Sequence, residues 1–114
     1  MFNDATKYSI EEVIKFCKES DIYIVNREKN RTFYEKINKT EQELIEEVRG
    51  LRVVNSCAEP ELDYGKNKKG YVYQFKKLVF ERYWCYIKLK IRFGKIVVVL
   101  SFHEDEEEAK YDQK

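Results

Sequence analysis

The segment 84–93 constrains the fold more than any other, because its side chains alternate strictly between two kinds. A period of two is that of a β-strand with one face in the core and the other toward solvent. The pattern therefore predicts a half-buried strand over 83–93. The apolar set should face the core: Cys85, Ile87, Leu89, Ile91 and Phe93. The other set should form an open face of aromatic and cationic side chains: Trp84, Tyr86, Lys88, Lys90 and Arg92.

Two further strands are expected at 71–80 and 96–102, both rich in β-branched and aromatic residues. Phe93-Gly94-Lys95 predicts a tight hairpin, so the last two strands should be antiparallel neighbours. The C-terminal half is therefore predicted to be an antiparallel three-strand meander. Four residues are expected to share one side of its last strand: Val97, Val99, Ser101 and His103.

The N-terminal half carries two helix signals. Two pairs of residues have the spacing of a capping box: Ser9 with Glu12, and Thr40 with Glu43. Apolar residues at helical spacing follow each pair. We therefore expect one helix at about 10–19 and a second that begins after Thr40 and stops at Gly50.

The remaining segments are less regular. Ile22–Val25 is β-branched and aromatic and predicts a short strand, and Val53-Val54 predicts a brief extended piece. Residues 27–40 are polar and fit neither pattern. Residues 59–70, which hold the single proline, should form one long loop of the kind that is often functional.

These elements predict the fold class. A chain of 114 residues fits a single domain, here residues 1–114 with an acidic tail at about 104–114. We expect an α+β fold in which two or three helices pack on a small curved antiparallel β-sheet.

Charge is distributed unevenly along the chain. Residues 51–103 carry eleven Lys or Arg and four Asp or Glu, whereas residues 104–114 carry two Lys and six Asp or Glu. The first segment therefore has a net charge of +7 and the second −4. One interpretation is that the open face of a sheet simply needs charged residues. The other is a surface that binds a polyanion, because cations beside exposed rings suit the phosphates and unstacked bases of single-stranded RNA.

We expect a cytoplasmic protein. Its start lacks the basic flank and apolar core of a secretory signal, and its longest aliphatic run, Ile96–Leu100, is too short to span a bilayer. The three cysteines are widely spaced, which favours reduced thiols over a disulfide framework or a zinc site. We expect no metal, no cofactor and no membrane contact.

The residue types favour one chemistry over others. The sequence has no Gly-rich phosphate-binding loop and no GxSxG nucleophile motif. His103 is the only histidine, and an unperturbed histidine has a pKa near 6.5, so it can transfer protons at neutral pH. RNA cleavage by attack of the ribose 2′-OH needs only such a group together with cations that hold the phosphate. Alternatively, His103 is an ordinary surface residue at the end of a strand.

The order of motifs resembles the MqsR-type toxins of bacterial type II toxin–antitoxin systems. The resemblance covers residues 40–104 and rests on five segments: 50–51 (GL), 59–61 (EPE), 70–75 (GYVYQF), 86–91 (YIKLKI) and 99–104 (VLSFHE). It implies a RelE-like fold and sequence-selective cleavage of mRNA without a metal and without the ribosome. It also implies a cognate antitoxin encoded nearby, which in this family is often a zinc-containing, DNA-binding protein.

The resemblance also implies site residues. The family's functional glutamine falls on Gln74, its tyrosine on Tyr86, and the basic residue after Ser-Phe on His103. A further functional lysine has no counterpart, because Ser56 stands at that position. Lysines of the long loop are the candidates to replace it: Lys66, Lys68 and Lys69.

We therefore predict an endoribonuclease toxin, an mRNA interferase. Its expected catalytic residues are Gln74, Tyr86, Lys88 and His103, with His103 as general acid or base and Lys88 as phosphate clamp. Six residues are expected to contact RNA: Tyr73, Lys76, Lys90, Arg92, Lys68 and Lys69. The alternative is a non-catalytic relative of the same fold that binds RNA or a protein partner.

Overall fold

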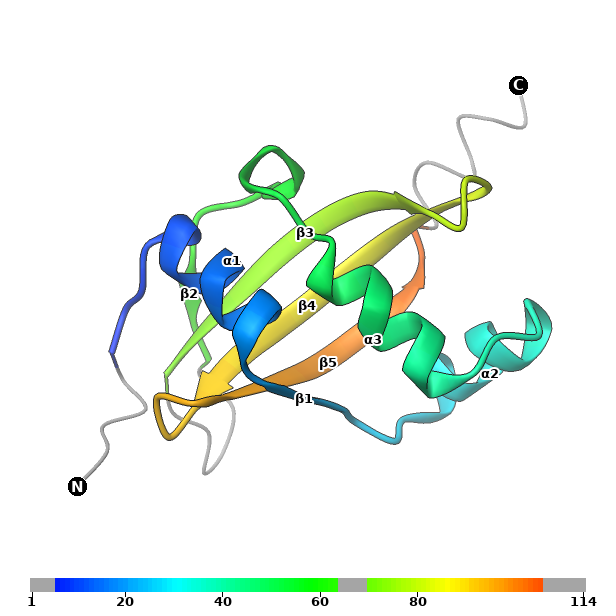
Figure 1. Ribbon diagram of the computed structural model, residues 1–114, viewed down its shortest axis with the longest axis horizontal. Coiled ribbons are helices and arrows are strands. Elements are labelled where there is room, and N and C mark those ends of the chain that lie inside the picture. The colour runs from blue at the N-terminus through cyan, green and yellow to red at the C-terminus, as the bar shows by residue number, and fades with distance from the viewer. Residues whose placement is uncertain (1–5, 64–69, 106–114) are drawn as a thin grey trace.

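The computed structural model describes residues 6–63 and 70–105 of the chain and has an α+β fold. Three helices pack on a five-stranded sheet, and Figure 1 shows α1 and α3 lying across one of its faces. The helices are α1 (Ile10–Glu19), α2 (Glu28–Lys36) and α3 (Glu41–Arg49). The strands are β1 (Asp21–Ile24), β2 (Glu61–Leu62), β3 (Tyr71–Val79), β4 (Tyr83–Arg92) and β5 (Ile96–Glu104). No helix within the described ranges is long and apolar enough to cross a membrane.

The strands lie in the order β1-β5-β4-β3-β2. The meander of β3, β4 and β5 is antiparallel, as predicted. The expectation of a wholly antiparallel sheet is wrong, because β1 pairs with β5 in parallel. Parallel neighbours need a long crossover, and the helices and strands between β1 and β5 provide it. The two-residue strand β2, which pairs with β3, is too short to leave a pattern in the sequence.

The two predicted helix starts are confirmed. In each capping box the N-cap hydroxyl accepts a hydrogen bond from the backbone N–H three residues on, and the glutamate accepts one from the N-cap backbone N–H. Helix α2 lies in the segment without a clear pattern: Arg27 caps it with no side-chain bond, and it buries only Asn30 and Phe33. Val53–Asn55 forms a 3-10 turn, η1, instead of the extended piece expected at Val53-Val54.

The core lies between the helices and the sheet. From β4 it takes Cys85, Ile87, Leu89 and Ile91, as the alternation predicts. Phe93 is the exception and is 44% exposed. It follows the last residue of β4 and has a φ of 58° in the hairpin turn, so its side chain leaves the face to which the alternation assigned it.

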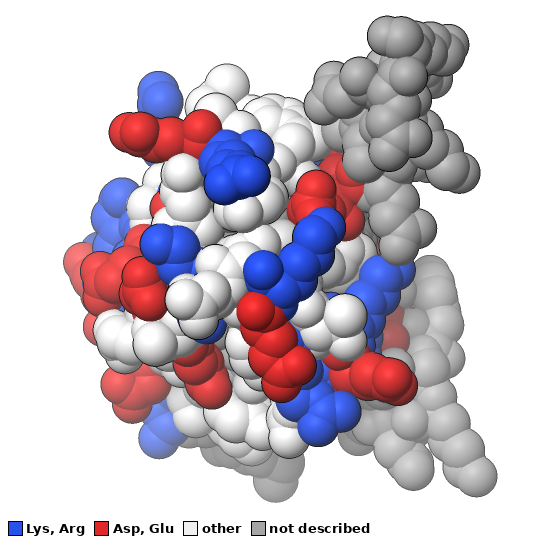
Figure 2. Space-filling view, turned by 90° about the vertical axis from the view of Figure 1, so that its right-hand side faces the viewer, with Lys and Arg blue, Asp and Glu red and all other residues white. Residues whose placement is uncertain are grey.

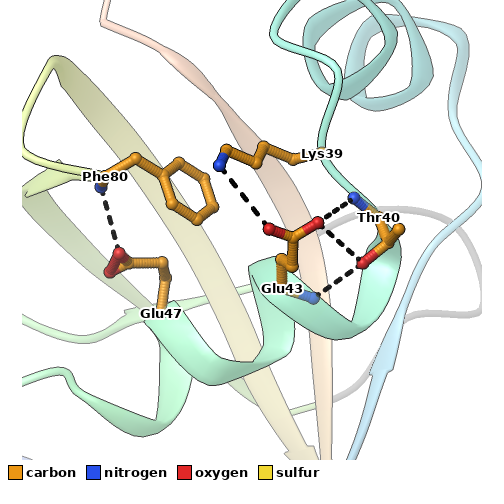
Figure 3. A network of polar contacts seen from close by, with 5 residues as sticks. All are labelled: Lys39, Thr40, Glu43, Glu47 and Phe80. Carbon is orange, nitrogen blue, oxygen red and sulfur yellow. Dashed lines mark hydrogen bonds and ion pairs between the residues drawn. The ribbon is translucent and has the colours of Figure 1, made fainter.

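Helix α3 is tied to the β3–β4 turn (Figure 3). Glu47 Oε1 accepts a hydrogen bond from Phe80 N at 3.0 Å. Lys39 Nζ lies 4.7 Å from the centre of the Phe80 ring and 3.5 Å from a carboxylate oxygen of the capping residue Glu43. Figure 2 shows an end of the molecule where positive and negative side chains are interspersed. Neighbouring opposite charges there largely offset each other.

Candidate functional site

A β-bulge in β5 determines which residues reach the open face, the face opposite α1 and α3. The pairing with β4 skips Leu100, since Ser101 pairs with Lys88 and Val99 with Leu89. One extra residue reverses the alternation. Before the bulge Val97 and Val99 are buried, and after it Phe102 takes the core position, so Ser101 and His103 lie on the open face. The expectation of one shared side is therefore wrong for this set: Val97, Val99, Ser101 and His103.

The bulge is held by a buried asparagine of α2. Asn30 Nδ2 donates hydrogen bonds to the carbonyl oxygens of Leu100 at 3.2 Å and Val25 at 3.0 Å. Asn30 Oδ1 accepts a hydrogen bond from Phe102 N at 3.0 Å. One amide thus satisfies the carbonyl of the extra residue Leu100 and the N–H of Phe102, two residues after it. No pattern in the polar segment 27–40 could have identified Asn30.

Tyr86 is the centre of the candidate site. In the sheet register it lies between Lys76 of β3 and His103 of β5. Its hydroxyl donates a hydrogen bond to Gln74 Oε1 at 2.9 Å. Its ring centre lies 5.8 Å from that of His103, with the two ring planes tilted by 46°. Three of the four predicted catalytic residues therefore meet on the open face.

Lys88, the fourth, belongs to the neighbouring row of the sheet. It pairs with Gln74 on one side and with Ser101 on the other, and its side chain is half-buried. Rows of side chains on one face of a strand are about 6.6 Å apart, which is twice the rise per residue. The ammonium group of Lys88 thus belongs to the row directly beside Tyr86 and His103.

The His103 ring is held in one orientation. Its Nδ1 lies 2.9 Å from the carbonyl oxygen of Glu104. A carbonyl oxygen can only accept, so Nδ1 carries the proton in this contact. In the neutral ring Nε2 is then the nitrogen with a lone pair, ready to accept a proton.

The Tyr86 phenol is held in its protonated form. Burial raises its pKa above the ordinary value, and the neighbouring Cys57 and Glu61 raise it further, against a smaller lowering by Lys76. At neutral pH Tyr86 is therefore a proton donor, and its bond to Gln74 uses that proton.

The row of cations on the outward side of β4 is less accessible to solvent than the sequence indicates. Lys90 is only 5% exposed, and its Nζ lies 3.3 Å from Asp63 Oδ2. The prediction of an open face is therefore wrong at Lys90, because Asp63, which follows β2, packs beside it. Lys76 is half-buried, with Nζ 2.9 Å from Asp105 Oδ2. Arg92 lies 5.1 Å from the centre of the Phe93 ring.

Other predicted RNA contacts lie elsewhere. Tyr73 is buried among core residues and its hydroxyl accepts a hydrogen bond from Tyr8 N at 2.8 Å, so its predicted place on the RNA surface is wrong. The reason is the strand period: Gln74 faces outward, so its neighbour Tyr73 must face inward. Lys66, Lys68 and Lys69 lie outside the described residues.

Two residues near the site were not predicted. The exposed Cys57 donates its backbone N–H to the Gln74 carbonyl at 3.0 Å, next to the bridge between Ser56 and Phe75. Asp105 is buried and pairs with Lys76. The acidic tail expected at about 104–114 therefore begins inside the folded domain, since Glu104 belongs to β5 and pairs with Lys36 at 2.8 Å. The rest of that tail, from residue 106, lies outside the described residues.

In the described parts of the chain, no group of three or more His, Cys, Asp or Glu could hold a metal ion. A scan of the sequence against protein-family models finds no match, and a search of the curated proteins finds no similar sequence.

Proposed function

We propose that this protein is an endoribonuclease toxin of the MqsR type with a RelE-like fold, which cleaves single-stranded mRNA without a metal and is neutralised by a cognate antitoxin. The observation that carries the proposal is the contact of Tyr86 with both Gln74 and His103 on an open sheet face, with Lys88 in the next row. Groups that donate and accept protons there stand beside a cation, as cleavage by the ribose 2′-OH requires.

The proposed reaction uses these groups in turn. His103 Nε2 takes the proton of the 2′-OH, and the 2′-oxygen forms a bond to the adjacent phosphorus. The bond from phosphorus to the 5′-oxygen of the next nucleotide breaks, and the Tyr86 phenol delivers a proton to that oxygen. The products are a 2′,3′-cyclic phosphate and a free 5′-OH. Lys88 holds the negative charge of the phosphate during the transfer.

The raised pKa of Tyr86 and the hydrogen bond of His103 support this division of roles. A phenol whose pKa is raised stays protonated and acts as an acid rather than a base. The contact of His103 Nδ1 with a carbonyl leaves Nε2 as the base. Gln74 fixes the position of the Tyr86 hydroxyl until the substrate replaces that hydrogen bond.

A second candidate is a non-catalytic protein that binds RNA or a partner through the same face. Lys90 and Lys76 are both paired with aspartates, which lowers the number of cations available to phosphates. Ser56 also stands where the resembling family has a functional lysine.

Cleavage of a mixed-sequence RNA at single turnover, with EDTA present, separates the two candidates. We expect products that end in a 2′,3′-cyclic phosphate, and no cleavage of the same RNA with 2′-O-methyl riboses. The His103→Ala protein, purified in parallel, controls for contaminating nucleases. RNA that stays intact at saturating protein would favour the binding protein over the nuclease.

A growth experiment tests the toxin assignment. Induced expression should arrest bacterial growth, and co-expression of the neighbouring gene should restore it. Normal growth with soluble protein confirmed at a high level would contradict the assignment.

A further inference from the structure

The open face carries a concave feature next to the candidate site, which we call the β1–β5 groove. It has a volume of about 510 Å³ and lies over β1, β5 and the end of β4. Its β5 side is aliphatic, formed by residues that precede or form the bulge: Ile96, Val98 and Leu100. The aromatic rings of Tyr23 and Phe93 contribute to its lining. The groove is thus the apolar continuation of the same sheet face.

The two rings of the groove are unusually exposed for aromatic side chains. Tyr23 is 55% exposed and Phe93 is 44% exposed. Phe93 also has a φ of 58°. This is the left-handed region, in which a residue with a side chain is strained and glycine is not. An exposed ring kept in a strained backbone position points to a role outside the core.

Two cations and one carboxylate line the groove, so its net charge is +1 and favours an anionic ligand over a cationic one. Arg92 lines it beside Phe93, and Lys90 lines it together with its partner Asp63. Lys88 lies one row closer to Tyr86 on the same strand. Aromatic faces next to cations are what the bases and phosphates of a single strand bind.

We propose that the β1–β5 groove binds one base of the RNA strand whose phosphate is cleaved at Tyr86 and His103. The inference rests on the proposed function for the identity of its ligand. A strand that lies along β4 with a phosphate at Lys88 places its neighbouring nucleotide over Lys90 and Arg92. Its base then meets the aliphatic side of the groove and lies against the rings of both Tyr23 and Phe93. The groove is the recognition half of the face, and the candidate site is the reactive half.

The first test measures the affinity of an uncleavable probe, a fluorescent hexanucleotide of mixed sequence with 2′-O-methyl riboses. Tyr23→Ala and Phe93→Gly should each raise Kd by about 5-fold to 100-fold, the range typical of one base–aromatic stack. Glycine suits the left-handed position of Phe93, so that variant should stay folded. The matched control is Val54→Ala, an apolar residue of η1 that is 72% exposed and does not line the groove, and its Kd should equal that of the parent.

A second test identifies the bound base. In a series of the same probe, each base in turn is replaced by an abasic site. One position should weaken binding to the parent protein but not to Tyr23→Ala, because the variant has already lost the stack. Equal effects at every position in both proteins would overturn the proposal, as would groove variants that bind the probe like the parent.

The possible results distinguish the groove proposal from the nuclease proposal. If the probe binds through the groove but ordinary RNA stays intact, the groove stands and the cleavage proposal fails. If RNA is cleaved but the groove variants keep the parent Kd and rate, the groove proposal fails and cleavage stands. Variants that keep the RNA affinity but lose the antitoxin would show a protein-docking groove, which also overturns the proposal. Failure of the parent to bind any RNA probe would overturn both.

Discussion

The open face has two halves that differ in chemistry although one strand, β5, runs through both. Before the bulge at Leu100, the outward residues of β5 are aliphatic and line the groove; after it, they are Ser101 and His103. The core side of the same strand is apolar throughout, with Val99 before the bulge and Phe102 after it. One inserted residue thus allows an unbroken core to carry an apolar surface and a polar surface side by side. A small sheet can thus keep an apolar groove apart from a cluster of polar side chains on the same face.

The largest effect that should distinguish the halves is the loss of His103. His103→Ala should lower the single-turnover cleavage rate by about 10²–10⁴-fold, the usual contribution of one general acid or base. The Kd for the uncleavable probe should change little, because binding is spread over many contacts. The measurement is the cleavage rate from pH 5 to pH 9 with EDTA present.

His103→Lys is the informative companion variant. A lysine at this position can stabilise phosphate charge but is a poor base at neutral pH. Partial activity would therefore favour an electrostatic role over proton transfer. Full activity of His103→Ala would falsify the catalytic role and would remove the functional contrast between the two halves.

The next effect concerns Asn30, which holds the bulge between the two halves. Asn30→Ala leaves buried backbone groups at the bulge without a partner and should lower the free energy of unfolding by about 3 kcal/mol, since each such group costs about 1–3 kcal/mol. Urea unfolding measures the loss. Asn55→Ala is the matched control, because Asn55 accepts one exposed hydrogen bond from Arg52 N, and its loss should cost about 1 kcal/mol.

Asn30→Ala should also reduce cleavage where the variant is still folded, because the bulge aims His103 at Tyr86. If the folded Asn30→Ala protein cleaves RNA at the parent rate, Asn30 is not needed to hold the bulge in place. Equal losses of stability in the two asparagine variants would contradict the role given to Asn30.

A smaller effect should separate two lysines that are neighbours on one side of β4. Lys88→Ala should reduce the magnitude of the salt dependence of RNA binding by about 0.7 in log–log slope, the share of one phosphate contact on a single strand. Lys90→Ala should leave the slope nearly unchanged and instead destabilise the fold, because it leaves Asp63 without the Lys90 ammonium. Titrations at four or more salt concentrations measure the slope. An unchanged slope for Lys88→Ala would remove Lys88 from the RNA contact.

The smallest effect compares the two hairpin turns of the meander. Phe80 and Phe93 both have left-handed φ values, of 52° and 58°. The Phe80 ring packs against the core and under Lys39, whereas the Phe93 ring borders the groove. Phe80→Gly should therefore lower stability by about 1 kcal/mol more than Phe93→Gly, in which relief of strain offsets the lost contacts. Thermal unfolding of both variants checks the difference, and a greater loss in Phe93→Gly would place that ring in a structural role.

The parts of this protein that were predictable depend on neighbours in the chain. The capping residues Ser9 and Thr40 lie three positions from their partners. The alternation of β4 places Tyr86 and Lys88 on one face through the period of the strand alone. The glutamine and histidine of the candidate site followed from motifs, and the structure brings Gln74 and His103 to the same tyrosine.

The remaining features depend on contacts between distant parts of the chain. Asn30 holds a bulge about 70 positions away, and Asp63 buries Lys90 across 27 positions. The parallel pairing of β1 with β5 likewise leaves no pattern in the nearby sequence. The sequence by itself thus determined α1, α3 and the meander, because short-range periodicity and capping encode them. Only the tertiary structure decided which side chains of β5 share a face and whether Lys90 is accessible, because a single inserted residue or one distant carboxylate reverses what the local pattern predicts.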